Sequence, residues 1–317
     1  MAKWIKKRAR GCLLGQLSGD ALGSLVEFES PERIRSRYPD GVREMREGGQ
    51  WNTLAGQPTD DSEMALALAR DLAERGTYDA ETVRRAYQRW LASEPFDCGN
   101  TVAMGLRGFP NTGSQANGAL MRISPLGIFG ALRSPDQVAE WARMDAALTH
   151  PNPICLQANA VFAVGLARAV KTGENPEKLF NFMLELAREW EADPALVQAM
   201  TRAADAPPAE YLEQQGWVLI ALGNALWQLL HAPDAETGVV DTIMRGGDTD
   251  TNAAICGALL GAVYGEDSLP RSWRSTLKHC RPARGHRGVY RPRPREYWPV
   301  DAAQLAVKLL RADPGKR

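Results

Sequence analysis

The sequence predicts an all-α protein, and three observations support the prediction. Apolar residues recur every three or four positions in several segments, as they do along one face of a helix. No stretch convincingly alternates apolar and polar residues with the two-residue period of a strand. Proline and glycine breaks separate the periodic segments. We therefore expect about ten or more helices, arranged as a compact multi-helix bundle.

The predicted helices follow one another along the chain. A helix rich in small residues lies at residues 11–23, and a second begins directly after the cluster Pro58-Thr59-Asp60-Asp61. Large apolar residues recur at helical spacing at residues 64–72, 162–170, 179–186, 222–230 and 305–309. The breaks between the helices are Pro58, Pro95, Pro110 to Gly113, Pro151, Pro153, Pro207-Pro208 and Gly246-Gly247. Residues of these types end helices or form turns.

Two of the predicted helices carry many small residues. Those of the first are Gly11, Gly15, Ala21 and Gly23, and those of a helix near residue 255 are Ala253, Ala254, Gly257, Ala258, Gly261 and Ala262. Glycine destabilises a helix interior by about 1 kcal/mol relative to alanine. Its repeated use predicts helices that pack backbone to backbone in a central layer.

Charge and composition exclude several classes of protein. The chain has 38 basic and 38 acidic residues, so its net charge is zero and a nucleic-acid-binding protein is not expected. Hydrophobic residues make up 44% of the chain, and no linker divides it, which predicts one domain over residues 1–317. No run of about 18 apolar residues is evident, so we expect no membrane-spanning segment.

The cysteines and the first residues bear on localisation. The five cysteines are scattered and form no CxxC pair, which favours a reducing compartment over a disulfide framework. The chain starts with the basic sequence MAKWIKKRAR, but Gln16, Ser18 and Asp20 interrupt the apolar stretch that follows. This start makes a poor signal peptide. We therefore expect a cytoplasmic protein.

Residues 271–296 differ in composition from the rest of the chain. This basic segment contains eight arginines, Lys278 and two histidines but one acid, Glu296. Arginine alternates with proline at residues 291–295, which favours an extended segment. We expect the basic segment to lie at the surface and to contribute little to any internal site. It would be either a solvated loop or a docking surface for an acidic partner or a phosphate-bearing ligand.

Two acid-rich segments stand at predicted helix starts. The first is Thr59-Asp60-Asp61, and the second is residues 248–251, with the sequence DTDT. A helix cap needs only one acceptor, so capping alone does not account for both carboxylates of a cluster. Carboxylate and hydroxyl oxygens are ligands of Mg²⁺ and Mn²⁺, whereas the lack of cysteine and histidine argues against zinc. Four carboxylates suit a pair of cations.

Six segments stand in a specific order between residues 11 and 262. They read GCLLGQLSGDALGSLVEF, PTDDSEMALAL, FDCGNT, QANGALMRISPLGIFG, LTHPNP and GGDTDTNAAICGALLGA. These segments resemble the ADP-ribosylglycohydrolase family. The resemblance implies an all-α bundle with two divalent cations, Mg²⁺ or Mn²⁺, at its centre. The metal ligands that it implies are Thr59, Asp60, Asp61, Asp248, Asp250 and Thr251.

The resemblance also assigns residues around the metals. Glu27 matches a glutamate that gates the site or responds to substrate, and Asp97 matches an active-site aspartate beside Asn100. The stretch that wraps the ADP-ribose is matched by the loop from Asn117 to Arg122, in which Asn117, Gly118, Ala119 and Met121 are the expected substrate-binding residues. His150 matches a histidine near the diphosphate. Taken singly, these residues have ordinary alternatives: a helix end for Glu27 and His150, a helix cap for Asp97, and a turn for residues 117–119.

The reaction that the resemblance implies is hydrolysis of the bond at the anomeric carbon of ADP-ribose. Asp61, Asp97 or Glu27 would act as the general base or hold the water, and all three stay open. Arginine-linked ADP-ribose on a protein is the leading substrate, and serine- or ester-linked ADP-ribose is the alternative. A hypothesis of another class is an immunity-type protein that binds and occludes an ADP-ribosyltransferase toxin. The expected partners are therefore an ADP-ribosylated protein, ADP-ribose or such a toxin.

Overall fold

The structure is a computed structural model that describes residues 1–312. Within this range the protein is all-α, with fifteen α-helices, four short 3₁₀ helices and no strand. Backbone pairing of the β type is limited there to two isolated bridges, Gly48 with Thr53 and Ala116 with Trp217. The all-α prediction is confirmed for these residues. The domain predicted over residues 1–317 includes residues 313–317, which lie outside the described range.

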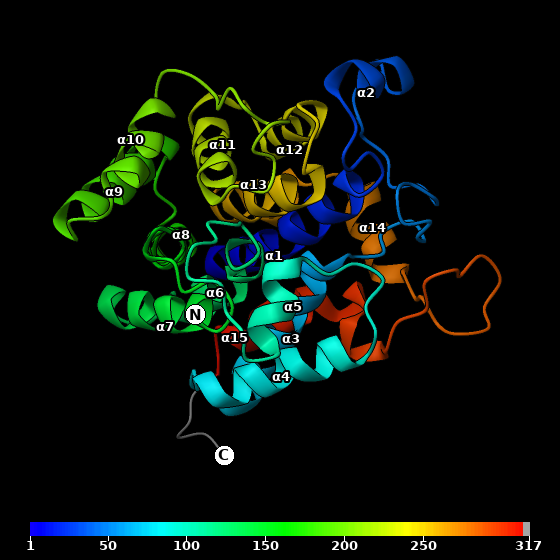
Figure 1. Ribbon diagram of the computed structural model, residues 1–317, viewed down its shortest axis with the longest axis horizontal. Helices are drawn as coiled ribbons and strands as arrows, with labels where there is room; N and C mark the ends of the chain where they lie inside the picture. Colours follow the sequence, from blue (N-terminus) through cyan, green and yellow to red (C-terminus); the bar gives the residue numbers. More distant parts are fainter. Residues whose placement is uncertain (313–317) are drawn as a thin grey trace.

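The helices follow one another along the described range, joined by short turns and by longer connections at residues 38–59, 107–119, 203–217 and 280–294 (Figure 1). The α-helices are α1 (Lys3–Gly23), α2 (Pro31–Arg37), α3 (Asp60–Arg75), α4 (Ala80–Ala92), α5 (Asn100–Leu106), α6 (Ser124–Gly130), α7 (Pro135–Ala147), α8 (Pro153–Thr172), α9 (Pro176–Glu189), α10 (Pro194–Arg202), α11 (Val218–His231), α12 (Ala235–Met244), α13 (Thr249–Tyr264), α14 (Arg271–His279) and α15 (Ala302–Leu309). The 3₁₀ helices are η1 (Leu120–Arg122), η2 (Glu266–Ser268), η3 (Arg295–Tyr297) and η4 (Pro299–Asp301).

Many of these helices begin at a residue whose side chain caps them. Asp79 accepts a hydrogen bond from the N–H of Thr82 at the start of α4, and Asn152 accepts one from Ile154 at the start of α8. In α3 and α13 the residue at the cap position makes no such side-chain bond. These two helices begin with the acid-rich segments, so their acidic side chains are not used as ordinary caps.

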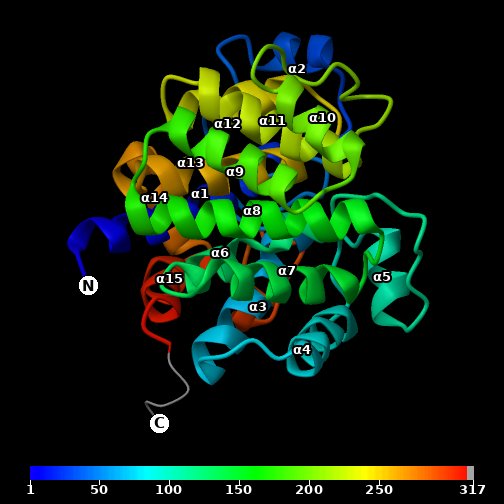
Figure 2. The ribbon, with the colours of Figure 1, turned by 90° about the vertical axis from the view of Figure 1, so that its left-hand side faces the viewer.

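α1 and α13 lie side by side through the middle of the molecule, and other helices surround them (Figures 1 and 2). Gly15 of α1 faces Gly257 of α13, and a Cβ atom on Gly15 would lie 2.8 Å from the carbonyl carbon of Gly257. Only glycine permits this approach. The predicted backbone-to-backbone packing is therefore confirmed. Gly23, at the end of α1, faces Thr249, at the start of α13, so the helices are antiparallel.

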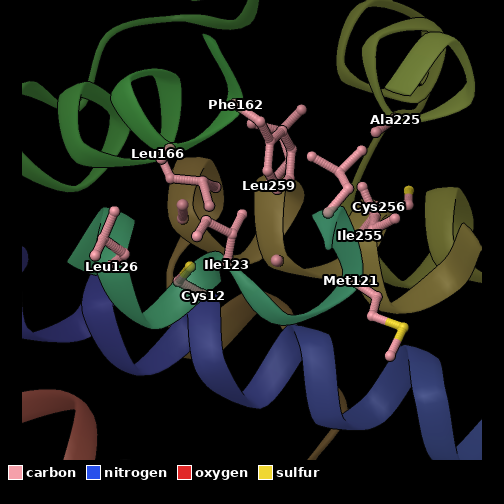
Figure 3. Packing of buried hydrophobic residues seen from close by; sticks show 14 of the residues in the cluster. Cys12, Met121, Ile123, Leu126, Phe162, Leu166, Ala225, Ile255, Cys256 and Leu259 are labelled. Atoms are coloured by element: carbon pink, nitrogen blue, oxygen red, sulfur yellow. The ribbon is translucent and has the colours of Figure 1, made fainter. Parts of the chain in front are cut away.

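Apolar side chains from several elements pack beside this pair (Figure 3). Cys12 of α1, Ile123 between η1 and α6, and Leu259 of α13 are all fully buried there, close to Phe162 and Leu166 of α8. Among residues 1–312, α8 is long and apolar enough to cross a membrane by length and composition alone, although no such run was expected. In the folded protein, 78% of the most apolar 18-residue stretch of α8 is buried. Packing in the core accounts for this hydropathy.

The basic segment at residues 271–296 is partly helical and partly an exposed loop. Its first nine residues form α14, which buries Trp273 and Leu277. The loop at residues 281–291 projects from the molecule (orange, right-hand side of Figure 1). Arg293 returns to the interior, where its side chain is 2% exposed and lies 2.8 Å from Glu63 of α3. The expectation of a surface position is wrong for Arg293, because Glu63 supplies a buried counter-charge.

Candidate metal and active site

Several distant segments line one cavity of about 220 Å³. The starts of α3, α5 and α13 meet there with the residues that follow α1 and the residues around η1. The lining residues that were predicted from the sequence are Glu27, Asp60, Asp61, Asp97, Asn100, Asn117, Gly118, Met121, His150, Asp248, Asp250 and Thr251. Thr59 and Ala119 are fully buried next to lining residues but do not themselves line the cavity. Both acid-rich helix starts therefore face the same space.

The start of α3 is capped by a side chain from α1. Asp20 is fully buried and accepts hydrogen bonds from the backbone N–H groups of Thr59 and Ser62, each at 3.1 Å. The hydroxyl of Thr59 lies 3.0 Å from one carboxylate oxygen of Asp20 and 3.0 Å from one of Asp61. Because Asp20 satisfies the first N–H groups of the helix, the neighbouring acids remain available to the cavity.

Asp60 and Asp61 have few donors from the protein. Asp60 accepts a hydrogen bond from the N–H of Gly99 at 3.2 Å, which holds the loop that contains Asp97 beside α3. Oδ1 of Asp61 is buried and has no hydrogen-bond partner within the described residues. A buried carboxylate oxygen without a donor is destabilising. A cation in the cavity would supply the missing partner.

A glycine turn aims the start of α13 at the same cavity. Gly246 and Gly247 have φ angles of 76° and 75°, which favour glycine. The N–H of Phe28 donates to the carbonyl of Gly247 at 2.8 Å, and the N–H of Gly247 donates to the carbonyl of Glu29 at 3.1 Å. These two bonds clamp the segment after α1 against the turn. Glu27 consequently lies beside the start of α13.

Glu27, Asp248 and Asp250 form a tight, buried acidic group. Each offers a carboxylate oxygen, and these oxygens all lie within 4.8 Å of one another. The side-chain amide of Asn117 donates to Asp248 at 2.7 Å, and the indole N–H of Trp51 donates to Glu27 at 2.6 Å. An all-oxygen donor set fits a hard cation such as Mg²⁺ or Mn²⁺. The predicted metal ligands did not include Glu27, whereas the structure groups it with two of them.

Burial and crowding raise the pKa values of these carboxylates. Burial, followed by the charge of Asp248, raises the pKa of Glu27 to about 8. Burial, followed by the charge of Asp60, raises the pKa of Asp97 to about 10. Burial, followed by the charge of Asp60, raises the pKa of Asp61 well above its usual range, and burial, followed by the charge of Glu27, does the same for Asp250. A divalent cation would offset the repulsion and lower these pKa values, so the residues fit a metal site.

A less acidic wall completes the cavity. Asn117, Gly118 and Met121 line it near η1, and Asn100 is an exposed lining residue at the start of α5. His150 is fully buried between α7 and α8. Burial, followed by the charge of Arg122, lowers the pKa of His150 to about 3, so the ring is neutral. Its Nε2 atom has no hydrogen-bond partner within residues 1–312.

Three neighbouring residues were not predicted from the sequence. Asp20 has a sequence signal, since it is the one acidic residue of α1 (Lys3–Gly23). Phe28 lines the cavity, is 54% exposed and has a φ of 63°, which is strained for a bulky residue. Trp51 lies outside any helix, and no periodic pattern marks it. Its contact with Glu27 depends on the folded loop alone.

This chain is similar to proteins of one family over most of its length. The family model described as ADP-ribosylglycohydrolase matches residues 1–310. The ADP-ribosyl-[dinitrogen reductase] glycohydrolase of Rhodospirillum rubrum is 30% identical over 289 residues, which cover 86% of this chain and 91% of that protein. The ADP-ribosylarginine hydrolase Tri1 of Pseudomonas putida is 27% identical over 285 residues, which cover 84% of this chain and 73% of that protein.

A solved structure has the same fold. It is described as an ADP-ribosylglycohydrolase-related protein complex, and it superposes with a TM-score of 0.81 at 28% identity, over 98% of this chain and 99% of that chain. The family model spans nearly the whole sequence, and the cavity is built from the segments that carry the resemblance. The chain therefore belongs to the ADP-ribosylglycohydrolase family, a family of hydrolases.

Proposed function

We propose that this protein is a metal-dependent hydrolase that removes ADP-ribose from modified arginine side chains of proteins. The observation that carries the proposal is the convergence of the acid-rich starts of α3 and α13, together with Glu27, on one cavity. Structural buried carboxylates are normally paired with a cationic side chain. Among residues 1–312, no lysine or arginine lines this cavity.

The proposal includes two divalent cations, Mg²⁺ or Mn²⁺. Thr59, Asp60 and Asp61 would hold one side of the metal centre. Asp248, Asp250 and Thr251 would hold the other side, with Glu27 next to them. Cations bound there would supply the charge that orients the ribose hydroxyls and activates water.

Among the three candidate bases we favour Asp97. Cleavage at the anomeric carbon develops positive charge on the ribose, and a carboxylate must take a proton from the attacking water. Asp61 and Glu27 belong to the two groups that would hold the cations, whereas Asp97 comes from the loop before α5. Asp97 is half-buried and lines the cavity, and cations in the cavity would lower its raised pKa so that it can accept the proton.

Two features favour arginine as the modified side chain. The guanidinium group is a planar cation, and the cavity offers it carboxylates together with the exposed ring of Phe28, because aromatic faces attract cations. One relative, Tri1 of Pseudomonas putida, is named as an ADP-ribosylarginine hydrolase. Serine- or ester-linked ADP-ribose would leave Phe28 without a cationic partner.

The test is to incubate the protein with arginine-, serine- and ester-linked ADP-ribose and to follow ADP-ribose release. Each substrate is tested with Mg²⁺, with Mn²⁺ and with a chelator. We expect release from arginine that requires one of the cations. Release from serine or an ester but not from arginine would favour the alternative linkages. No release from any substrate would contradict the enzymatic proposal.

A second candidate function is to bind and occlude an ADP-ribosyltransferase. The free charge on the basic segment favours it. Of the eight arginines at residues 271–296, Arg274 lies 3.9 Å from Asp267 and Arg293 pairs with Glu63, and the others form no ion pair within residues 1–312. Inhibition of the transferase that survives Asp60→Ala would support binding. Inhibition that is lost with this substitution would support catalysis.

We also propose one domain and a cytoplasmic location. The antiparallel pair of α1 and α13 joins the two halves of the chain through close backbone contacts, which favours one domain. All five cysteines are free, as in a reducing compartment.

A further inference from the structure

Arg122 is a buried cation whose position is completely determined by its partners. Its side chain and that of Asp145 are both 0% exposed, and Nε lies 3.0 Å from Asp145 Oδ2. Nη2 donates to the backbone carbonyl of Asp145 at 2.9 Å. The hydroxyl of Tyr87 donates to Oδ1 of Asp145 at 2.9 Å, and the guanidinium carbon lies 4.6 Å from the centre of the Tyr87 ring. The guanidinium is therefore rigid and its charge is compensated.

The remaining nitrogen of Arg122 connects this cluster to the cavity. Nη1 donates to the carbonyl of Gly118 at 3.1 Å and to the hydroxyl of Thr149 at 2.9 Å. The same hydroxyl lies 2.8 Å from Nδ1 of His150. A chain of hydrogen bonds thus runs from the buried guanidinium through Thr149 to a ring that lines the cavity.

This chain determines which ring nitrogen of His150 carries the proton. The hydroxyl of Thr149 accepts a hydrogen bond from Arg122, so its own hydrogen needs an acceptor. Among the described residues, Nδ1 of His150 is the acceptor within reach. If Nδ1 carried the proton instead, the hydroxyl hydrogen would be buried without a partner. The proton therefore belongs on Nε2.

His150 lines the cavity, and nothing within residues 1–312 accepts the hydrogen of its Nε2 atom. This nitrogen is buried. Gly118 lies directly against the ring, since a Cβ atom there would be 3.2 Å from Nε2 and 3.0 Å from Cε1. Buried donors in folded proteins are satisfied. The missing acceptor is therefore expected on a ligand.

We propose that Arg122 and Thr149 are positioning residues that hold His150 in the Nε2–H tautomer, so that the ring presents a neutral donor to an oxygen atom of bound ADP-ribose. The ligand part of this inference rests on the function proposed above. The tautomer part does not, because it follows from hydrogen bonds within the protein. The two parts can therefore be tested separately.

The protein contains internal references for the tautomer. Nδ1 of His231 lies 2.9 Å from the carbonyl of Trp227, and Nδ1 of His279 lies 2.8 Å from the carbonyl of Ser275. A carbonyl can only accept, so in their neutral forms these two rings carry the proton on Nδ1. Long-range ¹H–¹⁵N spectra of the ¹⁵N-histidine-labelled protein should show the opposite pattern for His150. An Nδ1–H pattern for His150 would overturn the proposal without the need for a variant.

A pair of variants at one position tests the role of Thr149. Thr149→Val removes the hydroxyl and nearly keeps the shape, whereas Thr149→Ser keeps the hydroxyl. With Val, we expect His150 to lose the pure Nε2–H pattern and the affinity for ADP-ribose, measured by calorimetry with Mg²⁺, to fall about three- to tenfold. In Thr149→Ser, the Nε2–H pattern of His150 and the affinity for ADP-ribose should both equal those of the unmodified protein. A Val variant that keeps either the wild-type tautomer or the wild-type affinity would overturn the proposal.

Failure of the proposed function gives a different result. If the unmodified protein binds no ADP-ribose while His150 shows the Nε2–H pattern, the substrate is wrong and the positioning of the ring by Thr149 and Arg122 is supported by the spectrum. If ADP-ribose binds and His150 shows the Nδ1–H pattern, the substrate is supported and the positioning is wrong.

Discussion

Two kinds of buried charge lie in the described part of the chain, and they are built in opposite ways. Arg122 and Asp145 are both fully buried, and the polar groups around them satisfy the pair. Glu27, Asp248 and Asp250 are also buried, but they crowd three carboxylates together with no cationic side chain in the cavity wall. The pair Arg293 and Glu63 belongs to the first kind.

The difference separates structural charge from functional charge. A buried charge that serves the fold is compensated within the chain, because an unpaired one costs several kcal/mol. Carboxylates that the chain leaves uncompensated have raised pKa values, and such perturbed groups cluster at functional sites. At the cavity, a ligand can relieve this destabilisation.

The largest expected effect follows from removing one of the uncompensated carboxylates. Asp250→Ala should abolish ADP-ribose release, because a proposed metal ligand is lost. The melting temperature of the metal-free protein should stay the same or rise, because repulsion is relieved. Release is measured at saturating Mg²⁺ or Mn²⁺, and melting is measured with a chelator. Unchanged turnover would rule out the assignment, and a large loss of metal-free stability would make Asp250 a structural residue.

The opposite result is expected for the compensated pair. Asp145→Ala leaves the cation of Arg122 buried and unpaired, which should destabilise the protein by about 3–5 kcal/mol. Urea unfolding measures this change, with and without Mg²⁺, and the loss should be the same in both. The double variant Arg122→Met with Asp145→Leu should regain part of it. A loss below about 1 kcal/mol for Asp145→Ala would remove the contrast between the two groups.

The pH dependence of the metal-free protein sharpens the comparison. The pKa values of Glu27 and Asp97 are raised to about 8 and about 10, so the native state holds protons that the unfolded chain releases. The stability that these two carboxyl groups contribute should be complete below about pH 4. It should be lost as the pH rises through 8 and 10. Saturating Mg²⁺ should reduce this fall.

Melting temperatures between pH 5 and 10, with a chelator or with Mg²⁺, measure this dependence. Asp250→Asn should flatten the metal-free curve, because it removes a carboxyl group whose own pKa is raised. A metal-free protein whose melting temperature is constant over this range would show that the carboxylates do not repel one another as the geometry implies.

The smallest effect is expected from the exposed charge of the basic segment. Arg284→Gln combined with Arg287→Gln should weaken binding of an ADP-ribosylated protein at low salt by up to about 1 kcal/mol per arginine. Hydrolysis of a small ADP-ribosyl-arginine should be unaffected, because that ligand needs only the cavity. Arg291 is left intact, since its Nε donates to the carbonyl of Trp51 at 2.9 Å.

Arg188→Gln on α9 is the matched control, since Arg188 is also exposed but lies away from the basic segment (Figure 1). It should leave both substrates unchanged. If Arg284→Gln combined with Arg287→Gln reduced hydrolysis of the small and the protein substrate equally, these arginines would lie in the active site. No loss on either would make the loop a solvated surface without a partner.

The sequence by itself determined the fold class and the main packing contact. Helical periodicity is a local property, so the apolar faces of α3, α8 and α11 are visible in the order of residues. The glycines of α1 and α13 indicate close backbone approach, because nothing else justifies their cost inside a helix. The acid-rich starts of α3 and α13 were also identifiable from the sequence, since local capping does not need so many carboxylates.

Only the tertiary structure decided which side chains meet. Asp20 caps α3 from another helix, Glu27 joins Asp248 and Asp250 through a backbone clamp, and Arg293 enters the core to reach Glu63. In each case the partners lie far apart in the chain. Periodicity records that a residue is buried, but not which distant group compensates its charge. That information exists only after α1 and α13 have packed and fixed the positions of the segments around them.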